Sequence, residues 1–282
     1  MNKNTSLNYE LIGSSLTEIE KNNSTIALNL LSEFFDVQTC VLTKDNKVCA
    51  VSLAKTLQEA YKKVMDSDGI NMFGGVLGFS QVIDLNLAKF LISSSPAIVI
   101  APDFSEDALE CLKAKNNIKL IKLDTALSDY KNILKNCETI SPFGIEINGN
   151  MNELQKDTFA VVTKKKPNSE EVEDAIFAWK VAKHTKSLAI VVAKDFQTKA
   201  VISSNNLLDG TAQALDLACE GSKEAILAFD DLIDFEECIL SAIQTRISLI
   251  IQSGGSVNEN KLIEICDKYD VAMITTGIKN LC

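Results

Sequence analysis

The feature that most constrains the fold is an order of helical and strand patterns that occurs twice along the chain. Each half has a helical pattern, two short strands, and then three alternations of helix and strand. A polar turn beginning Lys-Asp separates the first two strands in both halves, as Lys44-Asp45 and Lys194-Asp195. Helices that alternate with strands carry the chain back across a parallel sheet. The sequence therefore predicts two similar α/β layers, each a mostly parallel sheet that begins with an antiparallel hairpin.

Apolar spacing, cap residues and turn residues define the predicted elements. In the first half, helices are predicted over 23–35, 56–66, 84–93 and 105–115, with strands over 39–43, 47–53, 71–79, 97–101 and 118–123. In the second half, helices begin at 169 and span 207–220, 235–245 and 258–269, with strands over 188–194, 199–203, 224–229, 247–251 and 271–275. The predicted domains are an irregular N-terminal arm over 1–22, a first subdomain over 23–124, a connection over 125–168 and a second subdomain over 169–282.

The stretch 174–195 joins the first helix of the second half to its first strand. It holds the only tryptophan and the only histidine of the chain, Trp179 and His184. Apolar residues along one side of the helix predict that Trp179 lies in the core. We predict that Ser169 caps the helix and that His184 is a cation at its C-terminal end, where positive charge suits the helix dipole. The polar joint before the strand is a place where α/β sheets border ligand crevices.

The composition limits the classes of partner and site. The net charge of −10 argues against a nucleic-acid or anionic-membrane surface. The sequence has no apolar run that could span a bilayer and no signal-peptide core, so we expect a cytoplasmic protein that does not enter a membrane. Only one of the 28 basic residues, Arg246, is an arginine, and a single histidine cannot supply a three-histidine metal site. We therefore expect neither a phosphate clamp of several arginines nor a metal centre.

Six stretches carry motifs in a fixed order. They are TLQEAY from Thr56, FGGV from Phe73, IVIAPDFSEDAL from Ile98, FAWKVAKHTKSLAIVVAKDFQT from Phe177, IQSGGS from Ile251 and VAMITTG from Val271. In the same order they resemble TLxEAY, FGGI, VVIAPGFSEEAL, FAWKVAKHVKSNAIVxAKDGQT, IQPGGS and IAMVFTG of the AICAR transformylase family, the formyltransferase part of a bifunctional enzyme of purine biosynthesis. The resemblance covers about residues 38–282.

This resemblance implies a fold, a reaction and partners. The repeated element order is similar to that of the cytidine-deaminase-like fold, so we expect two such α/β/α subdomains in tandem. Zinc deaminases of that fold carry HxE and PCxxC, which this chain lacks, so no zinc is expected. The family transfers a formyl group from 10-formyltetrahydrofolate, its co-substrate, to the 5-amino group of AICAR. The implied ligands are therefore a nucleotide and a folate, and the implied assembly is a homodimer. We expect no cyclohydrolase activity, because the chain leaves no room for that domain.

The same resemblance indicates an incomplete catalytic set. The Lys-His pair of the family's KHxxPCG motif aligns with Lys44-Asp45, so the lysine is kept and the histidine is replaced. The family's KSN becomes Lys186-Ser187-Leu188, and its GxGAGQxSR segment becomes residues 200–208 without the arginine. We predict Lys44 and Asp45 as the catalytic pair. The residues predicted to line the substrate or folate pocket are Phe73, Gly74, Gly75, Lys186, Ser187, Gly254, Gly255 and Ser256.

Each of these predictions has a structural alternative. Lys44 and Asp45 can be ordinary turn residues of a hairpin, and the glycines can serve tight turns without a ligand. Three functions therefore stay open at this point. The chain is a formyltransferase with an altered site, a ligand-binding or regulatory paralogue without turnover, or an interaction protein that acts through its dimer surface.

Overall fold

The structure is a computed structural model that describes residues 7–115, 117–137, 139–148, 154, 159–186 and 188–279. The chain divides into two compact units, residues 1–151 and 152–282, and each unit has its own hydrophobic core. Ser187, one of the predicted pocket residues, lies outside the described residues.

The first unit begins with a strand and then follows the predicted order. Its elements are β1 (Tyr9–Ile12), α1 (Glu18–Glu33), β2 (Gln38–Lys44), β3 (Lys47–Ala54), α2 (Leu57–Met72), β4 (Val76–Phe79), α3 (Leu85–Ser94), β5 (Ile98–Ala101), α4 (Glu106–Lys113), β6 (Lys119–Leu123), α5 (Leu127–Asn136), β7 (Thr139–Ile140), η1 (Pro142–Gly144) and β8 (Ile147–Asn148). The large sheet of this unit has the order β1-β6-β5-β4-β2-β3, and β7 pairs with β8 separately.

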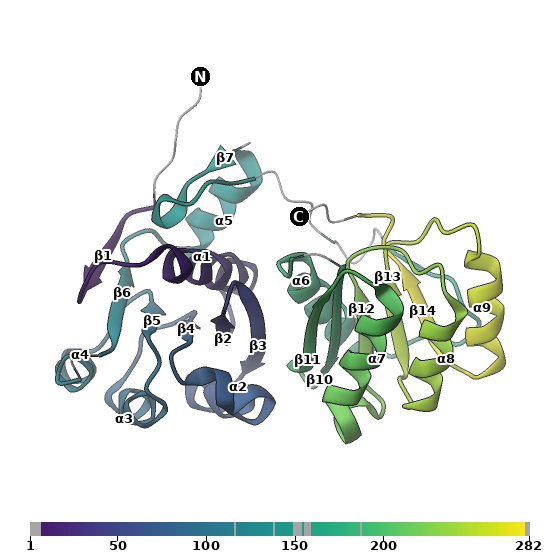
Figure 1. The fold of residues 1–282 in the computed structure, drawn as a ribbon, viewed down its shortest axis with the longest axis horizontal. Helices are drawn as coiled ribbons and strands as arrows, with labels where there is room; N and C mark the ends of the chain where they lie inside the picture. Colours follow the sequence, from purple (N-terminus) through teal and green to yellow (C-terminus); the bar gives the residue numbers. More distant parts are fainter. Residues whose placement is uncertain are drawn as a thin grey trace. The chain divides into compact units, whose positions relative to one another are not determined.

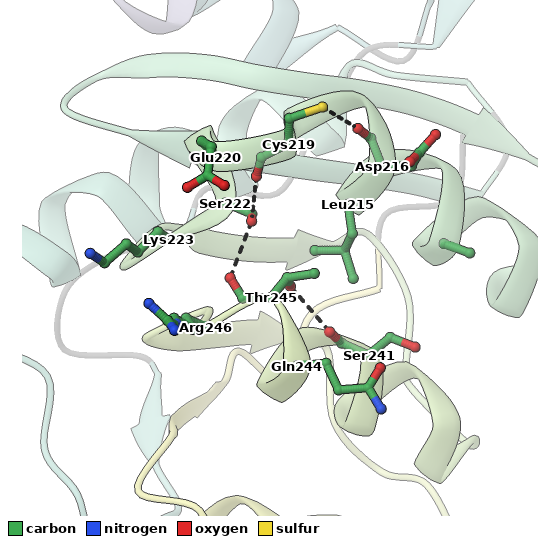
Figure 2. Close-up of a pocket in the computed structure, with 11 residues that line it drawn as sticks. Leu215, Asp216, Cys219, Glu220, Ser222, Lys223, Ser241, Gln244, Thr245 and Arg246 are labelled. Carbon is green, nitrogen blue, oxygen red and sulfur yellow. Dashed lines mark hydrogen bonds between the residues drawn. The ribbon is translucent and has the colours of Figure 1, made fainter.

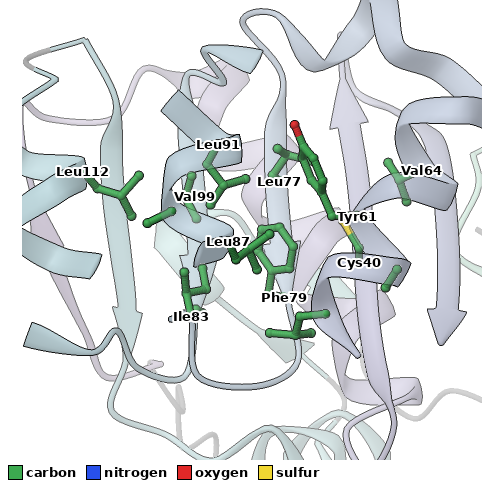
Figure 3. Packing of buried hydrophobic residues seen from close by; sticks show 14 of the residues in the cluster. Cys40, Tyr61, Val64, Leu77, Phe79, Ile83, Leu87, Leu91, Val99 and Leu112 are labelled. Atoms are coloured by element: carbon green, nitrogen blue, oxygen red, sulfur yellow. The ribbon is translucent and has the colours of Figure 1, made fainter. Parts of the chain in front are cut away.

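The first unit is a three-layer α/β/α structure (Figure 1). Strands β4, β5 and β6 are parallel, while β2 runs antiparallel to β3 and to β4. Helix α1 covers one face of the sheet, with α5 packed on α1, and helices α2, α3 and α4 cover the other face. Figure 3 shows Phe79 of β4 at the centre of the core under α2, α3 and α4, between Leu87 of α3 and Tyr61 of α2. Alternate residues of a strand point to opposite faces of the sheet, and the central strands β4 and β5 are buried along their whole length.

The second unit repeats this order. Its elements are β9 (Ala160–Val161), α6 (Ser169–Lys183), β10 (Leu188–Lys194), β11 (Gln197–Ser204), α7 (Leu207–Ala218), η2 (Cys219–Ser222), β12 (Ile226–Phe229), α8 (Glu236–Gln244), β13 (Leu249–Gln252), α9 (Glu259–Lys268) and β14 (Ala272–Thr275). Its strand order is β11-β10-β12-β13-β14-β9. Helix α6 covers one face of these strands, and α7, α8 and α9 cover the other face, where they enclose the hydrophobic core of the second unit.

The predicted repeat is confirmed down to the geometry of the hairpins. β2 pairs with β3 and β10 pairs with β11, both antiparallel, and each pair has a register shift near its turn, after Leu42 and after Val192. The next strand joins at the same register in both units, with Cys40 opposite Phe79 and Ile190 opposite Phe229. The prediction of a mixed α/β chain with parallel strands after an antiparallel hairpin is therefore correct in both halves.

Four local predictions differ from the structure. The strand predicted over 71–79 is β4 over Val76–Phe79 only, because α2 continues past the predicted end at 66 to Met72. The irregular arm over 1–22 contains β1, which pairs with β6, and α1 begins at Glu18 because Thr17 and Glu20 form a capping box. The connection contains the helix α5, whose cap residue Ala126 supplies no side-chain hydrogen bond and so left no sequence signal. Helix α6 is capped by Asn168 rather than Ser169, again through a capping box with Glu171. The core position predicted for Trp179 is correct, since its side chain is 0% exposed.

Candidate functional site

The predicted catalytic pair lies on the turn between β2 and β3. Lys44 is the last residue of β2, and Asp45 and Asn46 have φ values of 51° and 61°, the left-handed geometry of a two-residue hairpin turn. The backbone N–H of Asn46 donates to Oδ1 of Asn23 in α1, at 2.8 Å. Asp45 is exposed, while Lys44 is half-buried. The turn is therefore held by the helix beneath it.

The Lys44 side chain brings part of the predicted pocket to this turn. Its Nζ donates to the carbonyl oxygen of Phe73 at 3.0 Å, at the C-terminal end of α2. The Phe73 side chain is 72% exposed. Gly74 has a φ of 73°, and its N–H donates to the carbonyl of Ser95 at 3.1 Å. The turn and the segment 73–75 thus form one group at the amino ends of β4 and β5.

The second unit makes the same contacts with other residues. Nζ of Lys194 donates to the carbonyl oxygen of Lys223 at 3.0 Å, at the matching place after α7. The carboxylate of Asp174 in α6 accepts from the N–H groups of Asp195 and Phe196, both at 2.7 Å. A lysine at the end of the hairpin therefore satisfies a helix-end carbonyl in both units, which is a structural use of Lys44.

Cys49 of β3 lies in the electrostatic field of this turn. Burial, together with smaller contributions from the carboxylates of Asp68 and Asp45, raises the pKa of its thiol to about 12. A thiol with such a pKa is protonated at neutral pH and does not act as a nucleophile. The chemistry available at the turn is therefore that of an amine and a carboxylate.

Gly75 is required by packing inside the first unit. A Cβ atom at this position would lie 2.5 Å from the carbonyl oxygen of Asn71 and 2.9 Å from Cδ1 of Leu42. At Gly74 a Cβ atom would meet nothing within 4 Å, although its positive φ still disfavours other residues. The close approach of α2 accounts for the glycine at position 75 without a ligand.

We expect Gly75→Ala to be the more damaging of two matched substitutions. It should lower the free energy of unfolding by about 2–3 kcal/mol, because the backbone at Asn71 cannot move away without loosening α2. Gly74→Ala should cost only about 1 kcal/mol, the conformational penalty of a positive φ. Urea unfolding followed by circular dichroism measures both losses. Equal losses would show that the contact with Asn71 relaxes freely.

The predicted residues of the second unit lie at the other end of their sheet. Lys186 is exposed and precedes β10, and the loop 253–258 follows β13. Gly254 and Gly255 have φ values of 83° and 90°, so glycine suits both for backbone reasons. The N–H of Gly255 donates to Oε1 of Glu259 at 3.0 Å, and Ser256 Oγ donates to Oδ1 of Asp234. This loop sits at the carboxyl ends of the parallel strands, whereas Lys44 sits at the amino ends in its own unit.

Sequence reasoning missed Asp230 at this edge. Its side chain is 5% exposed, and its Oδ1 accepts from the N–H of Ala189 at 2.9 Å. Burial, with a smaller contribution from the neighbouring Asp231 carboxylate, raises the pKa of this carboxyl to about 7. In the first unit the equivalent acceptor is the hydroxyl of Ser80, which takes the N–H of Thr39 at 2.9 Å. The signal available in the sequence was an acidic residue directly after a strand that precedes a crossover.

The part of the chain that the structure describes offers neither a metal cluster nor a helix that could span a membrane. There, no three His, Cys, Asp or Glu side chains gather closely enough to hold a metal ion. None of the described helices has the length and apolar character needed to cross a bilayer.

Known proteins show where this chain belongs. The sequence profile of the family described as AICARFT/IMPCHase bienzyme matches residues 3–216. The chain belongs to this family. The bifunctional purine biosynthesis protein PurH of Caldicellulosiruptor bescii is 39% identical over 267 residues, which covers 93% of this chain and 51% of that protein. PurH of Clostridium botulinum is 37% identical over 275 residues, or 97% of this chain and 53% of that protein.

The AICAR transformylase-like protein spans about half the length of these curated relatives. A third, PurH of a Thermoanaerobacter species, is 37% identical over 272 residues, which cover 96% of this chain and 53% of that protein. Among solved structures, RibD of Acinetobacter baumannii aligns over 37% of this chain and 36% of its own, with a TM-score of 0.28 and 11% identity. A likeness of that size carries no argument about the fold of either unit.

Proposed function

We propose that this AICAR transformylase-like protein binds the ligands of its family but has lost most of the formyl transfer. The family's reaction takes a formyl group from 10-formyltetrahydrofolate to the amine of AICAR. That amine is a poor nucleophile and needs a base and a stabilised oxyanion. In this chain Asp45 replaces the family's histidine, and a carboxylate is a weaker base than an imidazole.

One observation carries this proposal. The amine of Lys44 is engaged with the carbonyl of Phe73, and Lys194 repeats that contact with Lys223 in the second unit, whose Lys194-Asp195 turn has no predicted catalytic role. A contact present in both units serves the hairpin and the helix end, so it leaves no need to assign Lys44 to catalysis. The replacement of the histidine and the absence of the arginine both favour a protein without formyl transfer.

Ligand binding would use the groups predicted from the family resemblance. Phe73 offers an exposed ring and Gly74 an exposed backbone beside Lys44, while the buried Gly75 shapes the turn that carries them. Lys186 and the loop that contains Gly254, Gly255 and Ser256 offer a cation and exposed backbone at the other candidate edge. Ser187 belongs to the same proposal as the neighbour of Lys186 in sequence.

Further assignments accompany this proposal. Each unit is assigned the cytidine-deaminase-like fold, over 23–124 and 169–282 with a connection over 125–168, on the basis of the repeated element order. A homodimer is proposed from the family resemblance, and Ile70 and Phe73, which are 87% and 72% exposed, offer an apolar surface for it. Light scattering that gives the mass of a single chain would count against the dimer. The assigned location is the cytoplasm.

The deciding assay is formyl transfer from 10-formyltetrahydrofolate to AICAR, with a bifunctional PurH as positive control. We expect no turnover above the rate in buffer, together with a rise in melting temperature when AICAR or the folate is added. A ligand at 100 times its Kd stabilises a folded protein by about 2.7 kcal/mol, which shifts the melting temperature by several degrees. If the chain shows no turnover and its melting temperature does not change with either ligand, the remaining function is that of an interaction protein.

Lys44→Met and Lys194→Met form a matched pair for this assay. Each removes one amine from a helix-end carbonyl, so each should lower the free energy of unfolding by about 0.5–1 kcal/mol. The second candidate function is a formyltransferase with an altered site. It is correct if the wild-type chain transfers the formyl group and only Lys44→Met abolishes the rate, which would make Lys44 and Asp45 a catalytic pair. The adjacency of that amine and carboxylate on one turn is the observation that favours it.

A further inference from the structure

The second unit contains a cavity that the family resemblance does not assign. It has a volume of about 590 Å³ and lies between the C-terminal ends of α7 and α8, at the amino ends of β12 and β13 (Figure 2). This is the opposite end of the sheet from Lys186 and the loop 253–258. A cavity of this size accommodates a small organic molecule.

Two cations line the cavity without a partner among the described residues. They are Lys223 and Arg246, the only arginine of the chain, and both side chains are exposed. Figure 2 shows them on the same side of the cavity. The carbonyl oxygen of Arg246 accepts from the N–H of Glu224 at 2.8 Å, so the two segments that carry these side chains are tied together. A guanidinium with no internal partner is a ready donor for a carboxylate or a phosphate.

The fold itself does not require these cations. The matching positions in the first unit are Phe73 and Ser95, because Gly74 N–H donates to the Ser95 carbonyl as Glu224 N–H does to that of Arg246. Ser95 and Arg246 both have left-handed backbones, with φ values of 46° and 63°. A serine is therefore compatible with this turn. The pair of basic side chains is a property of the second unit alone, in a chain whose net charge is −10.

The rest of the cavity suits the body of such a ligand. Leu215 of α7 lies in its middle and offers an apolar contact (Figure 2). The hydroxyl of Ser222 bridges the carbonyls of Cys219 and Thr245, at 2.7 and 3.1 Å, which holds the two helix ends together. Two carboxylates also line the cavity: Glu220 is drawn on the side of the cations and Asp216 on the opposite side. Glu220 leaves the basic side with one excess positive charge, and Asp216 favours a hydrogen-bond donor at the other end of the ligand.

We propose that this cavity binds a small organic oxyanion, a carboxylate or a phosphate ester, whose charged group is held by Arg246 and Lys223. The site is separate from the candidate formyl-transfer residues, so its existence does not depend on the proposed function. Arg246 supplies a two-pronged donor, Lys223 adds a point charge, and Leu215 packs on the carbon skeleton.

Titration calorimetry with the full chain tests the proposal with two probes, inorganic phosphate and glutarate. We expect at least one to bind with a Kd of about 1 mM or tighter, and the stronger of the two identifies the oxyanion. Arg246→Gln and Lys223→Gln should each weaken binding about tenfold or more, the effect of losing a charge-assisted hydrogen bond. Arg246→Lys should retain part of the affinity. Lys268→Gln removes an exposed cation outside the cavity and should bind like the wild type.

The thiol of Cys219 locates the bound probe. It is exposed and lines the cavity, so an occupied site should slow its reaction with a maleimide about tenfold at near-full occupancy, as read by peptide mass spectrometry. Cys111 and Cys137, outside the cavity, should react at unchanged rates. The proposal is overturned if neither probe binds the wild-type chain. It is also overturned if Arg246→Gln binds as tightly as the wild type.

Discussion

Asp230→Asn is expected to stabilise the second unit strongly at alkaline pH and weakly at acidic pH. The carboxyl of Asp230 is buried at the end of β12, and burial raises its pKa to about 7. In an unfolded chain the pKa of an aspartate is about 3.9. Ionising this carboxyl therefore costs more free energy in the folded state than in the unfolded state. The amide introduced by Asp230→Asn would not ionise, so the folded variant avoids this cost.

The direction follows from proton linkage. Because the folded-state pKa is the higher one, the folded state keeps its proton while the unfolded state has already lost it, so stability falls as pH rises between the two values. The contribution is fully present below the unfolded pKa and is lost once the pH passes about 7. The gain from Asp230→Asn should be roughly 4 kcal/mol at pH 8 and between 1 and 2 kcal/mol at pH 5.

Trp179 fluorescence during urea unfolding measures this gain, because the only tryptophan of the chain is buried in the same unit. Asp231→Asn is the matched control. Asp231 is half-buried and lies next to Asp230. Its substitution should therefore shift the curve of unfolding free energy against pH only slightly and should not change the slope of that curve. A gain from Asp230→Asn that is equal at pH 5 and pH 8 would contradict a raised pKa at this carboxyl.

Asp174→Ala is expected to lower the free energy of unfolding by about 3 kcal/mol. The Asp174 carboxylate accepts two backbone hydrogen bonds at 2.7 Å, from Asp195 and Phe196, and it is 9% exposed. Alanine would leave both N–H groups of the turn without these acceptors at a place with little access to water, and each lost charge-assisted bond costs about 1.5 kcal/mol or more. The loss should appear in the fluorescence of Trp179, which lies on the same helix.

The first unit supplies the comparison. Asn23 holds the equivalent turn with one hydrogen bond, from the N–H of Asn46, so Asn23→Ala should cost about 1 kcal/mol. Asp174→Asn keeps one acceptor oxygen and should fall between the two alanine variants. If Asp174→Ala costs no more than Asn23→Ala, the second hydrogen bond contributes nothing and the turn of the second unit is held by packing.

The local code of the sequence was sufficient for most elements. The helices predicted over 84–93 and 105–115 begin at Asp84 and Ser105, and each of these side chains accepts a hydrogen bond from the N–H three residues ahead, at 2.8 and 3.3 Å. Such a cap bonds an N–H within the first turn of its own helix, so the start of the helix can be predicted from neighbouring residues in the sequence. Apolar runs bounded by glycine, proline and acidic residues likewise marked the parallel strands of both units.

Short edge strands were beyond that code. β1 has four residues and β9 has two, and each becomes a strand only because a neighbour, β6 or β14, offers an unpaired edge. Neither segment has enough residues for an alternating pattern to stand out. Helix α5 was missed for a similar reason, since it packs on α1 and has no capping side chain.

The sequence by itself determined the α/β alternation, its repetition and the family, because these depend on residue order alone. Only the tertiary structure decided what the candidate residues touch. Lys44 meets a carbonyl 29 positions away, and Asp230 meets an N–H 41 positions away. The cavity beside Arg246 forms where two helix ends approach each other. Contacts of this kind depend on strand register and helix packing, which bring distant residues within hydrogen-bond distance and set the burial that shifts a pKa.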